Sequence, residues 1–227
     1  MIDISNVTKS FGSGAKRKVV ADNLTFQFPK GRCVALLGRN GAGKSTLLRM
    51  IAGTLSPDRG HVSRQGSVSW PVGFSGSFQG DLTGAQNIRF IARCYGVETD
   101  QLRDFVENFA ELGGHFHQAY KTYSSGMKSR LAFGVSMGIA FDTYLIDEVT
   151  SVGDAGFREK SIELLQDRIE RSGAIVVSHG KGVLRRVCDC ALILEQGKLQ
   201  FFEDLEEAIF VHEERITRSK KPLVGLS

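Results

Sequence analysis

Residues 38–46 constrain this chain more than any other part of its sequence. They read GRNGAGKST and fit the pattern G-x-x-x-x-G-K-[ST], in which a glycine-rich loop holds phosphate groups with its backbone amides. The apolar run 33–37 precedes this loop and the amphipathic run 47–52 follows it, so the order is strand, loop and helix. An accidental glycine-rich turn is the alternative. The motif together with its flanking elements predicts a nucleotide-binding site.

Each part of this loop has a physical role toward a nucleotide. The glycines let the backbone N–H groups point inward, and the N-terminus of the following helix adds partial positive charge. Lys44 supplies a mobile cation for the terminal phosphates, and the Ser45 hydroxyl is a predicted ligand of Mg²⁺. The predicted phosphate-binding residues are Gly38, Arg39, Asn40, Gly41, Ala42, Gly43, Lys44, Ser45 and Thr46.

The composition is that of a globular protein with a substantial core. Of the 227 residues, 41% are hydrophobic and 24% are charged, which fits one large or two small domains. The longest apolar runs, such as residues 131–141, are shorter than the roughly 18 residues of a membrane span. The first residues do not have the pattern of a signal peptide, so we expect a cytosolic protein with reduced cysteines. A net charge of +4 is too small to indicate a nucleic-acid partner.

Strands and helices alternate along the chain in an order that predicts an α/β fold. The segments around residues 2–7 and 19–28 have the pattern of an antiparallel pair of strands. Residues from about 83 to 140 are mostly helical in period and predict a helical insert, and a last amphipathic helix is expected after residue 203. Short apolar runs typical of buried parallel strands occupy residues 33–37, 143–146 and 174–177. This alternation predicts a doubly wound parallel sheet in a single domain.

Two carboxylates, Asp147 and Glu148, end one of the predicted parallel strands. Ligands of open α/β sheets bind at the carboxyl ends of the strands, so Asp147 is predicted to orient the magnesium shell together with Ser45. Glu148 is predicted to activate a water for attack on a γ-phosphate. An acidic pair that faces solvent is the alternative. His179 follows a neighbouring strand and is a candidate γ-phosphate sensor, although a structural histidine would explain that position equally simply.

The phosphate loop, the Asp147-Glu148 pair and His179, with a Ser-x-Gly turn between the first two, resemble an ATP-binding-cassette (ABC) ATPase over residues 2–202. The resemblance implies ATP as the nucleotide and Lys44, Glu148 and His179 as catalytic residues. It implies a P-loop ATPase core with an antiparallel β subdomain and a helical subdomain. The expected domain is one ABC nucleotide-binding domain over residues 1–227, with a C-terminal tail from about 203.

The Ser-x-Gly turn reads YSSGM at residues 123–127. In the family this turn reaches across a head-to-tail dimer and closes on the ATP of the partner subunit. The Ser124 hydroxyl and the Gly126 N–H would therefore contact the γ-phosphate of that ATP. Ser125 and Met127 replace the first glycine and the glutamine of the usual LSGGQ. We therefore expect an active ATPase, and a slow rate of hydrolysis is compatible with these replacements.

The resemblance assigns roles to three further residues. Phe11 occupies the position where an aromatic ring stacks on adenine, and a core phenylalanine at a strand end is the alternative. Asp154 is expected to link the two nucleotide sites of the dimer. Gln79 is the candidate for the glutamine that binds Mg²⁺ and signals to the membrane subunit, but it stands closer to Thr83 than the family's glutamine usually does.

Three longer segments resemble one branch of the family, the ATPases of bacterial polysaccharide exporters. These segments are IDEVTSVGDAGFREK, YSSGMKSRL and FQGDLTGAQNIRF, and the loop SWPVGFSGSFQGDLTG most resembles the exporters of capsular polysaccharide. The short stretch after the cassette also favours this type over O-antigen exporters. The resemblance implies a homodimer on the cytoplasmic face of the bacterial inner membrane, bound to an integral-membrane permease. The apolar and aromatic residues from Trp70 to Phe90 would form the groove that receives the permease, with ordinary core packing as the alternative.

Other functions stay open at this point. The exported polymer could be O-antigen or teichoic acid. A soluble ABC protein acting on ribosomes or DNA usually has two cassettes or a long coiled-coil insertion, neither of which is present. A GTPase switch would need an N-K-x-D stretch, which is missing, and an inactive module would result if the altered turn cannot close. Basic clusters at residues 16–18 and 218–221 fit either solvated surface or contact with anionic lipid or a partner.

Overall fold

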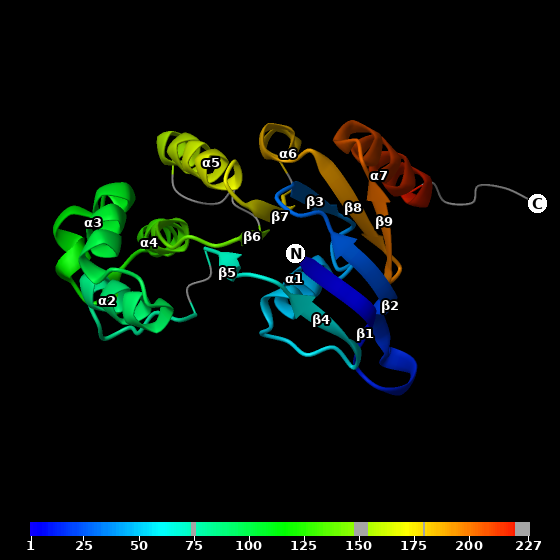
Figure 1. The fold of residues 1–227 in the computed structure, drawn as a ribbon, viewed down its shortest axis with the longest axis horizontal. Coiled ribbons are helices and arrows are strands. Elements are labelled where there is room, and N and C mark those ends of the chain that lie inside the picture. The colour runs from blue at the N-terminus through cyan, green and yellow to red at the C-terminus, as the bar shows by residue number, and fades with distance from the viewer. Residues whose placement is uncertain (74–75, 148–153, 179, 221–227) are drawn as a thin grey trace, which may run out of the picture.

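A computed structural model describes residues 1–73, 76–147, 154–178 and 180–220, and in these residues the strands form two sheets (Figure 1). The smaller sheet is antiparallel, with the order β2-β1-β4. Its strands are β1 (Ile2–Phe11), β2 (Lys18–Phe28) and β4 (Arg59–Arg64). Apolar residues at alternate positions near the start of β1, such as Ile2 and Ile4, are buried, and polar residues between them are more exposed, as expected for a sheet with one covered face.

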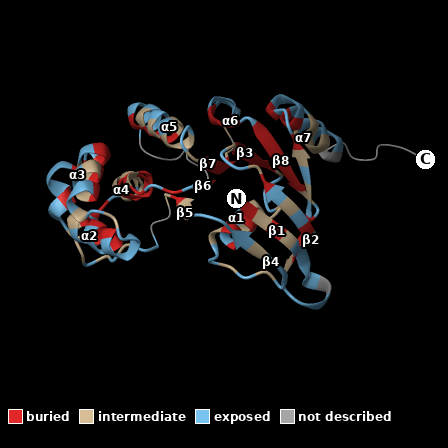
Figure 2. Ribbon diagram, in the orientation of Figure 1, coloured by how far each residue is buried: buried red, intermediate tan, exposed pale blue. Residues whose placement is uncertain are grey.

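The larger sheet has the strand order β5-β6-β7-β3-β8-β9. Neighbouring strands from β5 to β8 run parallel, and β9 is antiparallel to β8. The strands are β3 (Cys33–Leu37), β5 (Val68–Val72), β6 (Thr143–Asp147), β7 (Gly173–Val177), β8 (Cys190–Glu195) and β9 (Lys198–Phe202). Every residue of β3 and β7 is buried, which confirms the parallel strands predicted from continuous apolar runs (Figure 2).

Helices cover both faces of the larger sheet (Figure 1). α1 (Lys44–Ala52) and the antiparallel sheet lie on one face, where Leu145 of β6 joins a core that includes Leu47 and Leu48. α5 (Ala155–Ile169), α6 (Lys181–Val187) and α7 (Leu205–Lys220) lie on the other. There Tyr144 and Ile146 of β6 point into a second core. The two cores therefore share the central strands as their common wall, because successive side chains of a strand point to opposite faces.

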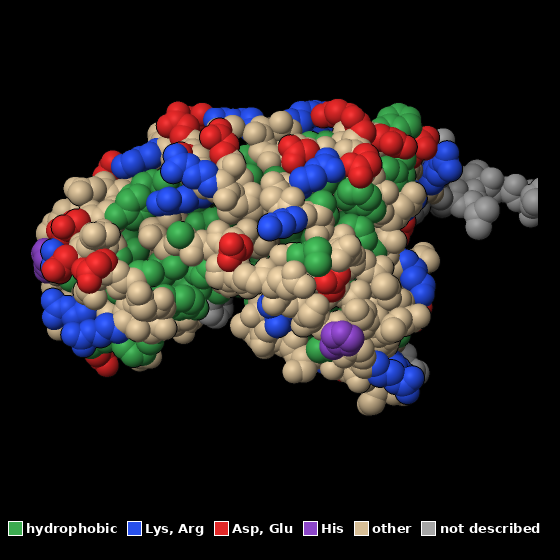
Figure 3. Space-filling view, viewed as in Figure 1, with side chains coloured by type: hydrophobic (Ala, Val, Ile, Leu, Met, Phe, Trp, Pro, Cys, Tyr) green, Lys and Arg blue, Asp and Glu red, His purple; other side chains and the backbone are tan. Residues whose placement is uncertain are grey.

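Ion pairs tie the outer helices to one another. Arg186 of α6 pairs with Glu159 of α5 at 2.8 Å, and Arg185 of α6 pairs with Glu206 of α7 at 2.6 Å. Figure 3 shows acidic and basic side chains interspersed along this side of the molecule. Such exposed pairs contribute little to stability because water and salt screen them, so the buried cores rather than the ion pairs hold the layers together.

A helical insert extends from the sheet between β5 and β6 (Figure 1). It contains α2 (Gly84–Tyr95), α3 (Thr99–Ala110) and α4 (Ser125–Gly138), with short 3-10 turns between α3 and α4. Thr83 caps α2 in a reciprocal arrangement with Gln86, which explains why the helical period begins there. The sequence pattern predicts this helix from Met127 to Ile139. α4 begins two residues earlier, at Ser125, since Ser124 caps it. Residues 71–83 are rich in Gly, Ser and Phe without a clear period, which predicts a loop. The first two of them are strand instead, because β5 continues through Pro71 to Val72 at the edge of the sheet.

Candidate nucleotide-binding site

The phosphate loop connects the end of β3 to the start of α1 and depends on its glycines. Gly43 has a left-handed backbone with φ of 109°, and a Cβ there would lie 2.9 Å from the Cβ of Val20. At Gly38 a Cβ would come within 2.5 Å of the carbonyl oxygen of Leu194. Both contacts are closer than real Cβ atoms allow. The loop can therefore pack against β2 and β8 only with glycine at these positions.

Lys44 is the first residue of α1, and its ammonium turns back toward the loop. Its Nζ donates hydrogen bonds to the carbonyl oxygens of Gly38, at 2.6 Å, and Arg39, at 3.2 Å. Ser45 follows in the first turn and is exposed, while Leu47 and Leu48 are buried in the core and anchor the helix. The N-terminus of α1 is thereby fixed with the Lys44 cation and the Ser45 hydroxyl at the loop.

Two cavities adjoin the phosphate loop. One, of about 270 Å³, is lined by the loop from Gly38 to Ala42 and by Lys18, Val19 and His212. The other, of about 190 Å³, is lined by Gly38, Lys44, Ser178 and His212. Burial, and then the nearby Lys44 ammonium, hold the pKa of His212 below its usual value. The cations Lys18, Arg39, Lys44 and Lys181 and the carboxylates Glu195 and Glu213 line the two cavities, so the charge around the loop is positive on balance, which suits an anionic ligand.

Phe11 lies at the exposed end of β1 and not in the core. Its side chain is 45% exposed, so the alternative of a core phenylalanine at this strand end is wrong. Phe11 is paired in register with Lys18 of β2, which lines the larger of the two cavities. The Lys9 ammonium lies 5.6 Å from the centre of the Phe11 ring. The ring is thus available to a flat ligand near the phosphate loop.

The carboxyl ends of β3, β7 and β6 lie side by side. Asp147 ends β6 and is paired in parallel register with Val177 of β7, and β7 pairs with β3 on its other side. This confirms the prediction that the strand before His179 neighbours the strand before Glu148. Glu148 and His179 themselves lie outside the described residues. The described ends of the strands bring the phosphate loop, Asp147 and Ser178 to one edge of the sheet.

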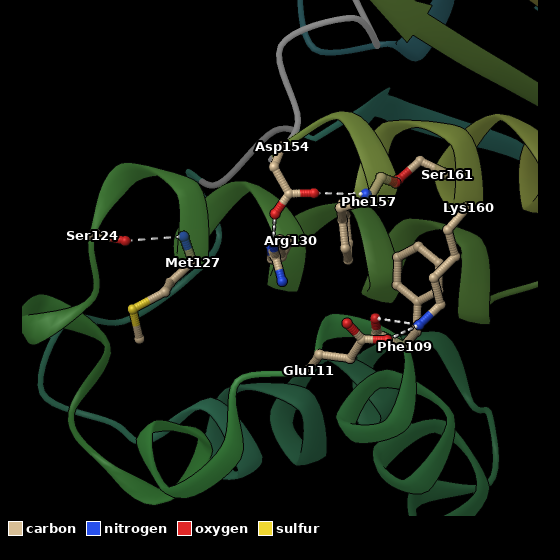
Figure 4. A network of polar contacts seen from close by, with 9 residues as sticks. All are labelled: Phe109, Glu111, Ser124, Met127, Arg130, Asp154, Phe157, Lys160 and Ser161. Carbon is tan, nitrogen blue, oxygen red and sulfur yellow. Dashed lines mark hydrogen bonds and ion pairs between the residues drawn. The ribbon is translucent and has the colours of Figure 1, made fainter.

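The Ser-x-Gly turn is exposed at the N-terminus of α4 (Figure 4). The Ser124 hydroxyl accepts a hydrogen bond of 3.2 Å from the backbone N–H of Met127 and so caps the helix. Gly126 has space around its Cα, since a Cβ there would meet nothing closer than 4.0 Å. The Ser124 hydroxyl is therefore exposed to solvent, and no neighbouring atom blocks the approach to Gly126.

Gln79 is exposed, and its backbone is held by a buried residue that the sequence analysis did not single out. The Asn87 Oδ1 accepts from the Gln79 N–H at 2.7 Å, and the Asn87 Nδ2 donates to the Gln79 carbonyl oxygen at 3.0 Å. Asn87 is fully buried on the same face of α2 as Ile88 and Ile91. A polar residue within an apolar helical face was the signal that could have found it.

The segment after Gln79 is bonded to the segment just before the Ser-x-Gly turn. The Tyr120 N–H donates to the Leu82 carbonyl oxygen at 2.8 Å, and the Lys121 N–H donates to the Gly80 carbonyl oxygen at 2.9 Å. Lys121 also forms an ion pair of 2.7 Å with Asp81. The Gln79 loop and the turn at residues 123–127 are therefore parts of one connected backbone network.

The described aromatic residues between 70 and 90 divide into packed and exposed ones, and Phe74 lies outside the described residues. Trp70 donates from Nε1 to the Ser136 hydroxyl at 3.0 Å, and its ring lies 4.9 Å from that of Tyr95. Phe78 stacks on Tyr120 with 5.0 Å between ring centres. Phe90 is 52% exposed. Core packing thus accounts for Trp70 and Phe78, whereas Phe90 is left at the surface of α2.

Among the described residues, the cysteines and carboxylates form no second candidate site. All four cysteines are free thiols, and the Cys33 and Cys188 sulfur atoms lie 3.3 Å apart in the interior. Within the ranges that the structure describes, no group of three or more His, Cys, Asp or Glu side chains could hold a metal ion. The Cys188-Asp189-Cys190 stretch is therefore not part of such a group.

The strand–loop–helix order, the helical insert and the exposed turn define an ATP-binding cassette. A solved structure with this fold, the dimeric ATP-binding cassette MJ0796 in a post-hydrolysis state bound to ADP and phosphate, superposes with a TM-score of 0.77 at 22% identity. The match covers 90% of this chain and 99% of that one. The ABC transporter family model matches residues 21–151. The chain belongs to the ABC transporter family, as one of its ATP-binding ATPase subunits.

Relatives of known role are similar over nearly the whole chain. The polysialic acid transport ATP-binding protein KpsT of Escherichia coli is 50% identical over 212 residues, which cover 92% of this chain and 97% of that protein. The capsule polysaccharide export ATP-binding protein CtrD of Neisseria meningitidis serogroup B is 46% identical over 209 residues, covering 92% and 96%. The O-antigen export system ATP-binding protein RfbB of Klebsiella pneumoniae is 34% identical over 240 residues, covering 94% and 98%.

Proposed function

We propose that this chain is the ATP-hydrolysing subunit of an ABC exporter that moves capsular polysaccharide across the bacterial inner membrane. The observation that carries the proposal is the ranking of the relatives. Identity is 50% and 46% to the proteins named for polysialic acid transport and capsule polysaccharide export, against 34% to the protein named for O-antigen export. A teichoic acid or O-antigen polymer is the second candidate substrate, since the protein named for O-antigen export is similar over 94% of this chain.

The phosphate loop binds ATP in this proposal. Backbone amides of residues 38–46 hold the phosphates, and Lys44 exchanges its carbonyl partners for phosphate oxygens. The donor set of Ser45, Asp147 and Gln79 consists of hydroxyl, carboxylate and amide oxygens, which is the chemistry that Mg²⁺ prefers. Two or three such ligands suit an ion that nucleotide phosphates and water also coordinate. When bound, the ion would neutralise charge on the phosphates.

Glu148 is proposed as the general base toward the attacking water, and His179 as the group that contacts the γ-phosphate. Support comes from the parallel pairing of β6 with β7 and of β7 with β3, since Glu148 directly follows β6 and His179 lies two residues after the end of β7. The chain leaving each strand starts at the edge of the sheet where the phosphate loop lies. This is where ligands of open α/β sheets bind.

ATP closes two copies of the chain head to tail in this proposal. Ser124 and Gly126 of one subunit contact the γ-phosphate on the loop of the other, and Phe11 stacks on the adenine. The exposure of Ser124 and Phe11 supports these roles, because both side chains are accessible to a ligand or a second subunit.

An integral-membrane permease is the proposed partner that places the subunit at the cytoplasmic face of the inner membrane. None of the described helices is long and apolar enough to cross a bilayer. The exposed rings of Phe90 and Tyr95 on α2 offer apolar surface to such a partner. They lie in the insert whose Gln79 loop is bonded to the Ser-x-Gly turn, so contact at α2 would be connected with the ATP site.

A pull-down from membranes tests the partner. Tagged Glu148→Gln protein with ATP is expected to recover a permease with several membrane spans. Recovery of ribosomes or DNA instead of a permease would be compatible with an ATP-binding cassette but would contradict the proposed transport function. Flux of a defined capsular polymer into membrane vesicles, measured beside O-antigen and teichoic acid polymers, then decides between the two candidate substrates.

A further inference from the structure

Two charged side chains connect the helical insert to α5 (Figure 4). Arg130 of α4 forms an ion pair of 2.8 Å with Asp154, the residue that caps α5. Lys160 of α5 forms an ion pair of 2.5 Å with Glu111, which directly follows α3, and donates to the Phe109 carbonyl oxygen at 3.2 Å. One cation thus comes from the insert and the other from α5, so the attachments are reciprocal.

Two aromatic rings fill the space between these cations. The guanidinium of Arg130 lies 4.3 Å from the centre of the Phe157 ring, and the Lys160 ammonium lies 5.1 Å from that of Phe109. The two rings meet edge to face with 5.1 Å between centres, and both are buried. We call the set Arg130, Asp154, Phe157, Phe109, Lys160 and Glu111 the insert clamp. Ion pairs and ring contacts together fix both the distance and the angle between the insert and α5.

Asp154 uses its two carboxylate oxygens for different elements. Oδ1 accepts from the Phe157 N–H at 2.9 Å and caps α5, while Oδ2 accepts from Arg130 at 2.8 Å. The Phe157 N–H, and then the Arg130 charge, lower the pKa of Asp154 below its usual value. The start of α5 and the flank of α4 are therefore held by a single ionised side chain.

Arg130 and the Ser-x-Gly turn lie on the same rigid helix. Ser124 caps α4, and Arg130 lies about 9 Å further along its axis at the usual rise per residue. The Arg130 side chain is only 20% exposed, whereas that of Asp154 is 70% exposed. A partly exposed ion pair contributes little to overall stability. Its effect is on orientation, because a small misplacement of a group that must meet a phosphate reduces the rate strongly.

We propose that Arg130 and Lys160 are positioning residues for ATP hydrolysis. They hold α4 against α5 at the angle that presents the turn at residues 123–127 to the ATP of the partner subunit. This inference rests on the proposed function, in which that turn acts on the partner's ATP. Neither residue contacts ATP. Their loss therefore lowers kcat at the partner's site and leaves the binding of ATP to the phosphate loop unchanged.

Mixed dimers test this directly. One chain carries Lys44→Ala, so the surviving site combines the phosphate loop of the other chain with the turn of the Lys44→Ala chain. Arg130→Gln in the Lys44→Ala chain is expected to lower kcat about tenfold, or about 1.4 kcal/mol of transition-state stabilisation, without changing KM for ATP. The same change in the other chain is expected to leave kcat near that of the parent dimer. Equal losses in both placements would overturn the proposal.

Further variants separate positioning from general damage. Arg130→Lys keeps the charge and is expected to restore part of kcat, while Lys160→Gln follows Arg130→Gln in the same direction. Arg103→Gln is the matched control, because Arg103 pairs with Asp100 and Asp104 within α3 and these pairs do not reach α5. A tenfold loss in this control would contradict the clamp.

Hydrogen exchange provides a readout that needs no hydrolysis. The clamp predicts faster exchange of the amides at residues 123–130 in Arg130→Gln than in Arg103→Gln. Unchanged exchange in Arg130→Gln overturns the clamp whatever the activity. A wild-type dimer without ATP turnover would contradict the proposed function, and the exchange measurement would still decide on the clamp.

Discussion

The Lys44 ammonium donates a hydrogen bond of 2.6 Å to the Gly38 carbonyl oxygen, within the loop to which both residues belong. The cation that is proposed to meet the terminal phosphates thus already has a partner in this structure. Binding of ATP then exchanges a neutral carbonyl for charged phosphate oxygens. The gain is the difference between these two interactions rather than the full strength of either.

This difference predicts the effect of Lys44→Ala. A full hydrogen bond to a charged group contributes about 1.5–3 kcal/mol, and the difference is only a part of this, so ATP affinity is expected to fall by about tenfold or less. Titration calorimetry with ATP measures it. Lys198→Ala, which removes an exposed cation paired with Asp22, is the control and should bind like the wild type. Unchanged affinity in Lys44→Ala would remove this lysine from the phosphate site.

Glu148→Gln is expected to abolish turnover while ATP still brings two subunits together. A glutamine keeps the size of the side chain but cannot take a proton from water, and such proton transfer contributes about 10²- to 10⁴-fold in rate. Phosphate release measures the loss, and light scattering with ATP measures the dimer. Hydrolysis near the wild-type rate would exclude Glu148 as the general base.

Asn87→Ala is expected to destabilise the protein although it lies away from the phosphates. The substitution leaves the Gln79 N–H and carbonyl without their buried partner, which costs about 1–3 kcal/mol. Urea unfolding gives the change in free energy. Gln86→Ala, which removes an exposed part of the α2 cap, serves as control and should lose less. If both variants lost the same amount, Asn87 would be an ordinary helix residue.

Acid is expected to loosen the antiparallel sheet through Asp58. The ammonium of Lys9, and then the Ser10 N–H, lower the pKa of Asp58 from 3.8 to about 2. Because this pKa is lower in the folded state, the stabilisation is complete above pH 3.8 and is lost as pH falls toward 2. Unfolding of wild type and Asp58→Asn, compared at neutral pH and near pH 2, measures it. A stability difference between the two proteins that is the same at both values would contradict the assignment.

The sequence alone predicted the phosphate loop and the parallel strands because their signals are local. The spacing of the glycines indicates the loop, and a continuous apolar run such as residues 33–37 indicates a strand that is buried on both faces. The pairing of Arg130 with Asp154 could not be found in this way. It joins α4 to the start of α5, and these helices meet through tertiary packing in which Phe109 of α3 contacts Phe133 of α4 and Phe157 of α5. Asn87 differs, since its place on an apolar helical face was a signal, but its partners, backbone atoms of a loop, could not be predicted.

Two boundaries differed for identifiable physical reasons. α4 begins at Ser125 because the Ser124 cap, which follows no apolar period, decides its first turn. β5 includes Pro71, a residue that argues against a central strand, because β5 is an edge strand and can tolerate a missing N–H. In both cases hydrogen bonding at the end or edge of an element decided the boundary, whereas the periodic pattern describes only its interior.

The order of strands in the larger sheet has a consequence for communication between the parts of the site. β7 stands between β3, which leads to the phosphate loop, and β6, which ends at Asp147. The chain that leaves β7 at Ser178 therefore has one of these two on either side. A displacement of β3 or of β6 therefore acts directly on the end of β7. The strand order makes the position of Ser178 sensitive to the distance between the phosphate loop and Asp147.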